Sequence, residues 1–314
     1  MENERVKISA FCVKCLVDKQ FKIADKMESE HEKVAYMRQV LQVIYENMDK
    51  LSTPIMEACF AKNYKIKEEE KQQYQCIKRK YNELFLSKES AIYDAIMNSD
   101  EPVKTAIQYV QMGNYIDFGV NGTFSEEILE QLMDTVSQNQ VGEKTYLRFL
   151  KQCSNGNRVV YLLDNCGEAV LDKIFIRVLK KTYSNLEIIA VVRGEDVVND
   201  VTKDDAEYIG LPSICKVIGN GTAIAGTSMD HVEKVVRDAI EGADLIISKG
   251  QGNFETMYGN GFPVYYIFLC KCEWFMKRFL CERNTAIFHT EDEICKILQK
   301  SGEKLGFVKG ESVC

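Results

Sequence analysis

The sequence is poor in histidine, has no excess of basic charge and contains no long apolar run. Its three histidines, His31, His231 and His289, show no metal-ligand spacing, so a histidine-based catalytic or metal set is not indicated. The net charge of −7 predicts no basic surface for nucleic acid. No apolar run reaches the ~18 residues of a transmembrane helix, and the charged start MENERVKISA lacks the apolar core of a signal peptide. We therefore expect a cytoplasmic protein without a nucleic-acid or membrane partner, and no protein partner is implied.

Three motifs of nucleotide and phosphate chemistry are also absent. No G-x-G-x-x-G follows a predicted strand, which argues against a nicotinamide site, and the Walker A spacing G-x-x-x-x-G-K-[ST] does not occur. The absence of a D-x-D-x-T/V element argues against the haloacid dehalogenase type of phosphatase. An acidic chain that handles phosphate must therefore do so at a local site of metal, lysine or backbone N–H groups.

Cysteine, in contrast, is frequent, and the 12 cysteines of a chain without a secretion signal predict reduced thiols. Six are isolated and are expected to be small core residues: Cys59, Cys76, Cys153, Cys215, Cys281 and Cys295. Cys12 and Cys15 form a C-x-x-C pair, for which packing, redox chemistry and metal binding all stay open. A zinc site would need two more ligands, and Cys270 with Cys272 is the only clustered candidate.

Helical patterns fill the first hundred or so residues, which contain one proline. Residues 65–86 form a helical pattern whose charged face we interpret as solvent-exposed surface. Residues 99–119 open with Pro102, which is typical of a helix start. We expect a helical N-terminal part over residues 1–105. Within it, residues 32–51 predict an amphipathic helix whose buried stripe is Val34, Met37, Val40, Leu41, Ile44 and Met48.

Short apolar runs recur beyond residue 155, with helical patterns at 168–181 and 229–241 between them. The runs cover residues 159–163, 188–192, 214–218, 245–247 and 264–269. Strands that are apolar throughout and alternate with helices are typical of a parallel sheet covered on both faces. The sequence therefore predicts an α/β fold over residues 106–314, a three-layer sandwich with a mainly parallel, Rossmann-like sheet.

Acidic and amide residues follow the first two of these runs, at the edge where a parallel sheet binds ligands. Asp164 and Asn165 come directly after the first run, and Asp200 lies in the loop after the second. Their oxygens suit a hard cation such as Mg²⁺ or Mn²⁺, so all three are candidate metal ligands. Helix capping is the alternative, because Asp164 precedes a helix and Asp200 adjoins the capping-box pattern of Thr202 and Asp205.

Glycine-rich loops with a lysine or a threonine follow the later runs, in the segments GNGTAIAGTS and SKGQGNFE. Glycines permit close backbone approach, and a lysine supplies a point charge for phosphate. Either loop alone is also explained as an ordinary turn, but together with the acids they predict a phosphorylated ligand bound through a metal. The loop residues concerned are Gly226, Thr227, Lys249, Gly250 and Asn253, and Arg193, directly after the second run, is a further candidate for binding the substrate.

Four segments, GNYIDFG, YLLDNCGEAVLD, RGEDVVNDVTKDDA and ISKGQGNFE, together resemble the metal-dependent damage-control phosphatases. This domain-of-unknown-function family also includes proteins described as acidic-residue methyltransferases. The matching segments extend over residues 114–272, and the N-terminal CVKC is similar to the stand-alone prokaryotic branch. The resemblance implies an α/β sandwich with a helical N-terminal part, and a divalent cation held by Asp164, Asn165 and Asp200.

The resemblance also implies the substrate side of the site, where a lysine and an asparagine meet the phosphate. Cys166 and Cys270 depart from the family pattern, which has alanine at both positions. Carried onto this chain, the substrate-side residues are Asn114, Asp117, Lys249, Asn253 and Lys271.

These residues favour a metal-dependent phosphomonoesterase for a sugar phosphate or a damaged phosphometabolite, with Mg²⁺, Mn²⁺, Co²⁺ or Ni²⁺ as the cation. Lys249 would stabilise charge on the phosphoryl oxygens, and Glu168 or Asp200 would be the general base. Asp164 is either a ligand only or a nucleophile that forms an aspartyl-phosphate. Two alternatives stay open: an S-adenosylmethionine-dependent carboxyl methyltransferase, and a non-enzymatic protein that binds a metal or a phosphate ester.

Overall fold

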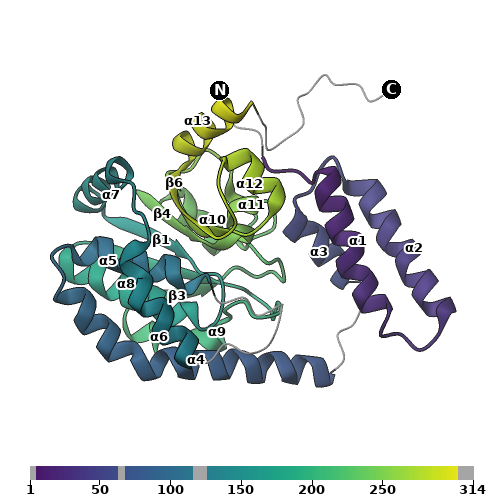
Figure 1. Cartoon of the computed structure of the whole chain (residues 1–314), viewed down its shortest axis with the longest axis horizontal. Helices are drawn as coiled ribbons and strands as arrows, with labels where there is room; N and C mark the ends of the chain where they lie inside the picture. The colour runs from purple at the N-terminus through teal and green to yellow at the C-terminus, as the bar shows by residue number, and fades with distance from the viewer. Residues whose placement is uncertain (1–4, 63–67, 116–125, 303–314) are drawn as a thin grey trace.

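The computed structural model describes residues 5–62, 68–115 and 126–302, which form a six-stranded sheet flanked by helices (Figure 1). The strand order is β3-β2-β1-β4-β5-β6, in which β1 to β5 are parallel and β6 is antiparallel to β5. This order changes direction between β1 and β4, as in a doubly wound Rossmann-like sheet. The predicted α/β class with a mainly parallel sheet is confirmed.

Five of the six strands lie on the predicted apolar runs. The third strand begins later than predicted because Ile214 still belongs to the end of the 3₁₀ turn η2 (Leu211–Ser213). The sixth strand has the mixed sequence TAIFHT and gave no apolar run. The strands are β1 Arg158–Leu162, β2 Glu187–Val192, β3 Lys216–Gly219, β4 Leu245–Lys249, β5 Val264–Cys270 and β6 Thr285–Thr290.

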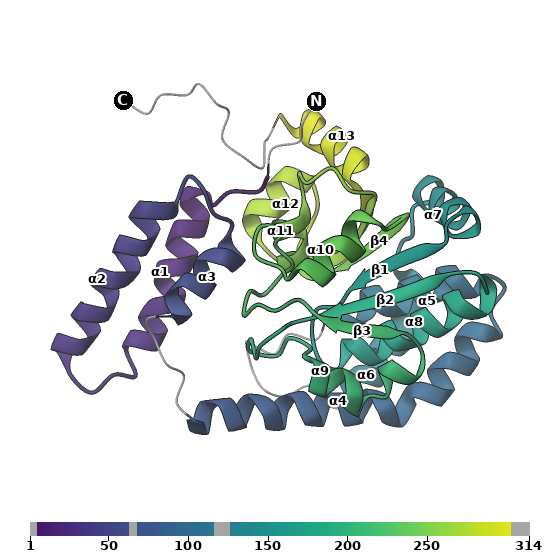
Figure 2. The ribbon, with the colours of Figure 1, turned by 180° about the vertical axis from the view of Figure 1, so that it is seen from behind.

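Helices cover both faces of the sheet (Figure 2). Successive residues of a strand point to opposite faces, so Val159 and Tyr161 of β1 enter one core while Val160 and Leu162 enter the other. The first core contains α4 Glu68–Met97, α5 Pro102–Gly113, α6 Glu126–Thr135, η1 Val136–Gln138, α7 Glu143–Asn155, α8 Glu168–Thr182 and α9 Lys203–Tyr208. The second contains α10 Lys234–Glu241, α11 Gly250–Met257, α12 Glu273–Phe279 and α13 Glu291–Ser301.

Three N-terminal helices, α1 Ala10–Ala24, α2 Glu30–Asn47 and α3 Thr53–Ala61, stand to one side of the sheet in both ribbon views. The predicted buried stripe of α2 is only partly right. Val40 and Ile44 are buried, but Val34 and Leu41 are 50% and 53% exposed. The buried face follows Tyr36, Val40 and Ile44 at four-residue spacing, and the Tyr36 hydroxyl bonds to Gln20 of α1.

The helix α4 runs along the lower edge of the molecule in Figure 1 and packs on α8. Its charged face is not solvent-exposed throughout, because Lys78 and Asn82 are 3% and 1% exposed. The next helix, α5, ends at Gly113, and residues 116–125, which include the predicted end at residue 119, lie outside the described residues. Both α4 and α5 pack on α8, and the division of the chain at residue 105 stays a prediction.

The helix α10 begins five residues later than the predicted start at residue 229. The backbone N–H groups of His231 and Val232 donate to the Ser228 carbonyl, and that of Glu233 donates to the Asn220 carbonyl, so a turn precedes the helix. Within residues 5–62, 68–115 and 126–302, no helix combines the length and the apolar composition needed to cross a membrane.

Candidate active site

The predicted site residues after β1, β2 and β4 meet at the carboxyl edge of the sheet. The strand order places β1 between β2 and β4, at the point where the order changes direction. Two isolated bridges, Asn165 with Asp200 and Arg193 with Thr202, join the chain beyond the ends of β1 and β2. A ligand of an open α/β sheet binds in this crevice, so the position agrees with the predicted site.

The turn between β1 and α8 presents Asp164 and Asn165 without using Asp164 as a helix cap. Gly167 precedes the helix with a φ of 82°, a left-handed conformation that favours glycine. The Glu168 side chain instead binds back to this turn: its Oε1 accepts the backbone N–H of Asn165 at 3.2 Å and the Asn165 amide Nδ2 at 2.7 Å. The Asp164 carboxylate accepts the same Nδ2 group through Oδ2 at 2.8 Å.

The loop between β2 and α9 carries Asp200, which is likewise not a cap. Thr202 and Asp205 form the capping box of α9 with each other. The Asp200 side chain is therefore available to the site. The backbone N–H of the next residue, Val201, donates to the Asp164 carbonyl at 2.9 Å. These contacts hold the ends of β1 and β2 in one arrangement.

Arg193 joins the carboxylates from the two strand ends. Its side chain is fully buried, and its Nε donates to Asp200 Oδ2 at 2.5 Å while its Nη2 donates to Asp164 Oδ1 at 3.4 Å. Its Nη1 donates to Asn253 Oδ1 at 3.3 Å. The Asn253 amide in turn donates to the Leu163 carbonyl at 2.9 Å, so α11 is tied to the same cluster.

Lys249, at the end of β4, lies beneath this cluster. Its Nζ is 2.9 Å from Asp172 Oδ1 and 3.2 Å from Glu168 Oε2, and all three side chains are buried. The Tyr161 hydroxyl also donates to Asp172 Oδ1, at 2.5 Å. The ammonium group thus neutralises two buried carboxylates, and its contact with a substrate phosphate stays a prediction.

Four carboxylates share the site with two buried cations; three of them are buried and the Asp164 side chain is 12% exposed, and their pKa values reflect the excess of negative charge. Burial first, and then the charges of Glu168 and Asp200, raise the pKa of Asp164 well above its ordinary value. Burial also raises the pKa of Asp200, although Arg193 opposes the change. The pKa of Asp172 rises to about 6 because its burial outweighs the attraction of Lys249.

Glu168 is the exception among these four carboxylates. Burial acts to raise its pKa, but the charge of Lys249 and the hydrogen bonds from Asn165 and Lys249 outweigh it, so the pKa is lowered. The charge of the half-buried Lys271 adds to the lowering. Asn114 lies beside Glu168: its Nδ2 donates to both oxygens of Glu168 at 3.3 Å, and its Oδ1 accepts from the Leu269 backbone at 3.0 Å. Asp117 lies outside the described residues.

Within the loop after β3, Gly226 and Thr227 are buried, and Thr227 supports Asn253. The Thr227 hydroxyl donates to Asn253 Oδ1 at 2.8 Å, and the Thr227 N–H donates to Thr256 Oγ1 at 2.9 Å. A β-carbon on Gly226 would lie 2.7 Å from the Gly252 carbonyl oxygen, which explains the glycine at this position.

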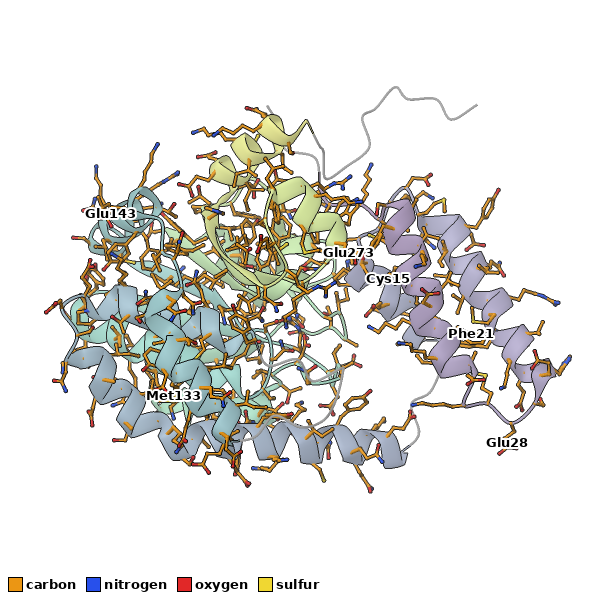
Figure 3. The ribbon with its side chains drawn as sticks, viewed as in Figure 1. Cys15, Phe21, Glu28, Met133, Glu143 and Glu273 are labelled. Atoms are coloured by element: carbon orange, nitrogen blue, oxygen red, sulfur yellow. The ribbon has the colours of Figure 1, made fainter. Side chains whose placement is uncertain are left out.

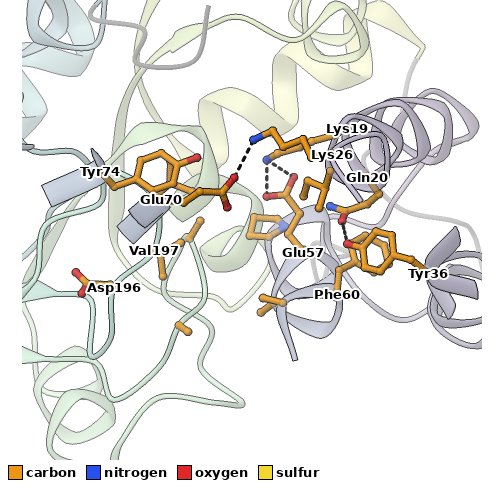
Figure 4. A pocket seen from close by; sticks show the side chains of 17 residues that line it. Lys19, Gln20, Lys26, Tyr36, Glu57, Phe60, Glu70, Tyr74, Asp196 and Val197 are labelled. Carbon is orange, nitrogen blue, oxygen red and sulfur yellow. Dashed lines mark hydrogen bonds and ion pairs between the residues drawn. The ribbon is translucent and has the colours of Figure 1, made fainter. Parts of the chain in front are cut away.

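A cavity of about 200 Å³ lies between α1–α3 and the loops that follow β2 and β3 (Figure 4). Hydrogen-bonded and ion pairs line its helical side, including Lys19 with Glu57 at 2.8 Å. Val197 and Val198 line the opposite side and directly precede the Asn199–Asp200 pair of the site. The loop between β2 and α9 therefore both lines the cavity and carries Asp200 of the site.

Gly250 packs closely against the Asp164 carboxylate. Its φ is 79°, and a β-carbon there would collide with the Asp164 carboxylate. We expect Gly250→Ala to lower activity about 100-fold by displacing Asp164, in addition to a backbone cost of about 1–2 kcal/mol. Gly261 is the matched control: its φ is 76° and no atom lies within 4 Å of the added carbon, so Gly261→Ala should carry the backbone cost alone. Equal activities of the two variants, measured per folded molecule, would contradict the packing described for Gly250.

The donor set fits a divalent cation in chemistry and in charge. Asp164, Asp200 and Asn165 supply oxygen donors, and a cation would offset the repulsion that raises the pKa of Asp164. Among the described residues, no three histidine, cysteine, aspartate or glutamate side chains form a metal-binding group. Asp164 and Asp200 both bind Arg193, and the Asn165 amide oxygen accepts from Asn199 Nδ2 at 2.7 Å.

The cysteine predictions are confirmed in part. Cys153 and Cys215 are buried, but Cys76 is exposed. Cys12 is buried and Cys15 is exposed on α1 (Figure 3). Cys12 belongs to the second core and Cys272 packs against the same core, and burial above all raises the pKa of the Cys272 thiol.

Several side chains of the site had no place in the sequence prediction. Asp172 is four residues after Glu168 and therefore on the same helix face, a spacing that would have indicated it. Asn199 precedes Asp200, and its amide fixes the Asn165 side chain. Lys78 and Asn82 come from a distant helix, and no local pattern marks them.

Residues 8–287 match the family of the damage-control phosphatase ARMT1-like domain. A damage-control phosphatase of Archaeoglobus fulgidus is 29% identical over 275 residues, which are 85% of this chain and 93% of the relative. An uncharacterized protein of Methanocaldococcus jannaschii is 27% identical over 86% of this chain and 91% of its own length. A damage-control phosphatase of Pyrococcus horikoshii is 32% identical over 53% of this chain and 58% of that protein. The crystal structure of a DUF89 family protein of the same archaeon covers 91% of this chain and 100% of its own, with a TM-score of 0.74 at 22% identity, which shows the fold.

Proposed function

We propose that this chain, which belongs to the damage-control phosphatase ARMT1-like domain family, is a metal-dependent phosphomonoesterase. The observation that supports this most is the meeting of Asp164 and Asp200 on one buried arginine at the carboxyl edge of the sheet. Two carboxylates with the Asn165 amide beside them are the donors that a hard cation prefers. The substrate we propose is a small phosphorylated metabolite, such as a sugar phosphate or a damaged phosphometabolite.

Asp164, Asn165 and Asp200 would hold Mg²⁺, Mn²⁺, Co²⁺ or Ni²⁺, which polarises a phosphoryl group and lowers the pKa of bound water. The remaining residues of the chain position this set and supply positive charge. Lys249 keeps Glu168 ionised, and Glu168 in turn fixes the Asn165 side chain. Lys271, which is half-buried and whose charge helps to lower the pKa of Glu168, is the cation we assign to the oxygens of the transferred phosphoryl group.

The organic part of the substrate would extend toward the cavity beside Val197 and Val198. Its paired polar side chains, such as Lys19 and Glu57, offer donors and acceptors to a hydroxyl-bearing molecule. We place the protein in the cytosol, a proposal supported by the free thiols of every cysteine among the described residues.

A phosphate-release screen tests the function. We expect release from at least one member of a phosphometabolite panel with at least one of the four cations, and no release in a chelator. Asp200→Asn should lower the rate about 100-fold or more, because several kcal/mol of charge stabilisation are lost. Asp238→Asn is the matched control, since this exposed residue pairs only with Lys234 on the surface of α10 among the described contacts.

If no member of the panel released phosphate with any of the four cations, the phosphatase proposal would be contradicted. Calorimetry with S-adenosylmethionine belongs in the same experiment. Binding of that cofactor without phosphate release would favour methyl transfer, and tight binding of a phosphate ester without turnover would favour a binding protein.

A further inference from the structure

We propose that Lys78 and Asn82 of α4 are positioning residues that hold the two metal-binding loops in their active arrangement, an inference that rests on the proposed function. The two side chains are one helical turn apart, and both are almost fully buried, whereas their neighbours Lys80 and Glu83 are exposed. Each reaches a different loop of the site. The charged face of α4 thus contains two buried residues that contact the loops of the site.

Lys78 binds the β2–α9 loop on both sides of Asp200. Its Nζ is 3.2 Å from Asp196 Oδ1 and 2.6 Å from Asp205 Oδ2. Asp205 Oδ2 also accepts the N–H and the hydroxyl of Thr202, at 2.9 and 2.7 Å, so Lys78 neutralises the carboxylate that begins α9. A buried ammonium that contacts residues four before and five after Asp200 fixes the span between them.

Asn82 binds the other loop, the turn between β1 and α8. Its Oδ1 accepts the backbone N–H of Gly167 at 2.7 Å. Gly167 lies between the proposed ligands and Glu168, and α4 packs closely on it: an added β-carbon would be 3.1 Å from Tyr81 Cβ. Lys78, Tyr81, Asn82 and Phe85 occupy one face of α4 at the spacing i, i+3, i+4 and i+7.

The β1–α8 turn and the β2–α9 loop are hydrogen-bonded to each other. The backbone N–H of Cys166 donates to the Asn199 carbonyl at 2.9 Å, and that of Val201 donates to the Asp164 carbonyl at 2.9 Å. A shift of either loop therefore changes the separation of Asp164 and Asp200. Because cation binding requires donors held at defined distances, α4 acts on the site through these two loops.

Mn²⁺ affinity measured by calorimetry with the metal alone tests this inference, together with kcat, KM and the urea unfolding midpoint. We expect Lys78→Met and Asn82→Ala each to weaken Mn²⁺ binding about 10-fold to 100-fold. The same variants should lower kcat at subsaturating metal with little change in KM for the substrate. Lys78→Arg and Asn82→Asp keep the cation and the acceptor, so each should recover most of the affinity.

Lys173→Met is the matched control for loss of a buried ion pair at the same helix, because Lys173 of α8 pairs with Glu89 of α4. Lys173 Nζ binds Glu89 of α4 at 2.7 Å and the Ile209 carbonyl at 2.7 Å, and it contacts neither loop at a proposed ligand. This variant should lower the unfolding midpoint but keep the Mn²⁺ affinity of the folded protein.

Wild-type Mn²⁺ affinity in both Lys78→Met and Asn82→Ala would overturn the inference. Equal weakening in Lys173→Met would also overturn it, because the effect would then be one of general stability. A wild type that binds Mn²⁺ but releases no phosphate would contradict the proposed function alone, and the affinities of the variants would still decide the role of α4. A wild type that binds none of the four cations would overturn both.

Discussion

Asp164→Asn is expected to abolish metal-dependent turnover and, at the same time, to stabilise the metal-free protein. The carboxylate is largely buried beside Glu168 and Asp200, and this burial, followed by the two charges, raises its pKa. A pKa that is higher in the folded than in the unfolded state means that the ionised group destabilises the fold at neutral pH. Asparagine keeps the shape and removes the charge, so we expect the free energy of unfolding to rise.

Urea unfolding at pH 7 with a chelator measures the gain, and the same experiment with Mn²⁺ measures the metal site without reference to activity. A ligand that binds only the folded state stabilises it by about 2.7 kcal/mol at 100 times its Kd. The wild-type midpoint should therefore rise with Mn²⁺, whereas the midpoint of Asp164→Asn should not. Turnover of the variant should fall about 1,000-fold or more.

Asp244→Asn provides a control of opposite sign. Asp244 Oδ2 accepts the backbone N–H groups of Asn157 and Arg158 at 2.8 and 3.0 Å, and these bonds lower its pKa. Its neutralisation should lower stability at pH 7 and leave turnover unchanged. A destabilised Asp164→Asn variant that still responds to Mn²⁺ would refute both the repulsion and the assignment of the ligand.

Much of the fold was predictable because it depends on local patterns. Residues that are apolar throughout a run, such as 188–192 and 264–269, must be buried on both faces, and that requirement alone indicates a parallel sheet under two helical layers. The edge strand β6 lacks such a run, because among the described residues it pairs with β5 alone. Its mixture of Thr, Phe and His residues is not distinguishable from a loop in the sequence.

The candidate site was predictable to the extent that strand ends converge. The topology brings Asp164 and Asp200 together, and a pattern of acids after apolar runs is sufficient to find them. The pairing within the site was not predictable. Which cation neutralises which carboxylate depends on side-chain rotamers and on the register of α4 against α8, and neither leaves a periodic signal in the sequence. Lys249 illustrates this: its sequence context suggests a phosphate ligand, and its contacts in the structure are two buried carboxylates.

Lys249→Met is expected to cost about 3–5 kcal/mol of stability, the effect of leaving buried charges without a partner. Lys249 is fully buried, and its partners Glu168 and Asp172 are 2% and 0% exposed. Burial alone would lower the pKa of Lys249, but the charges of Asp172 and Glu168 raise it, which shows how strongly the pairing favours the ammonium form. Turnover should also fall, because Glu168 then loses the charge that keeps it ionised and no longer fixes Asn165.

The double variant Lys249→Met with Asp172→Asn separates the stability of the site from its chemistry. Removing Asp172 leaves one unpaired carboxylate in place of two, so urea unfolding should show that a large part of the lost stability returns. Turnover should stay low, because Glu168 still lacks its cation. The double variant should also keep the hydrogen bond from Tyr161, since the amide oxygen of asparagine can accept it as Asp172 Oδ1 does. A Lys249→Met single variant with wild-type stability would mean that the two carboxylates are neutral without it, and the charge balance described for the site would then be wrong.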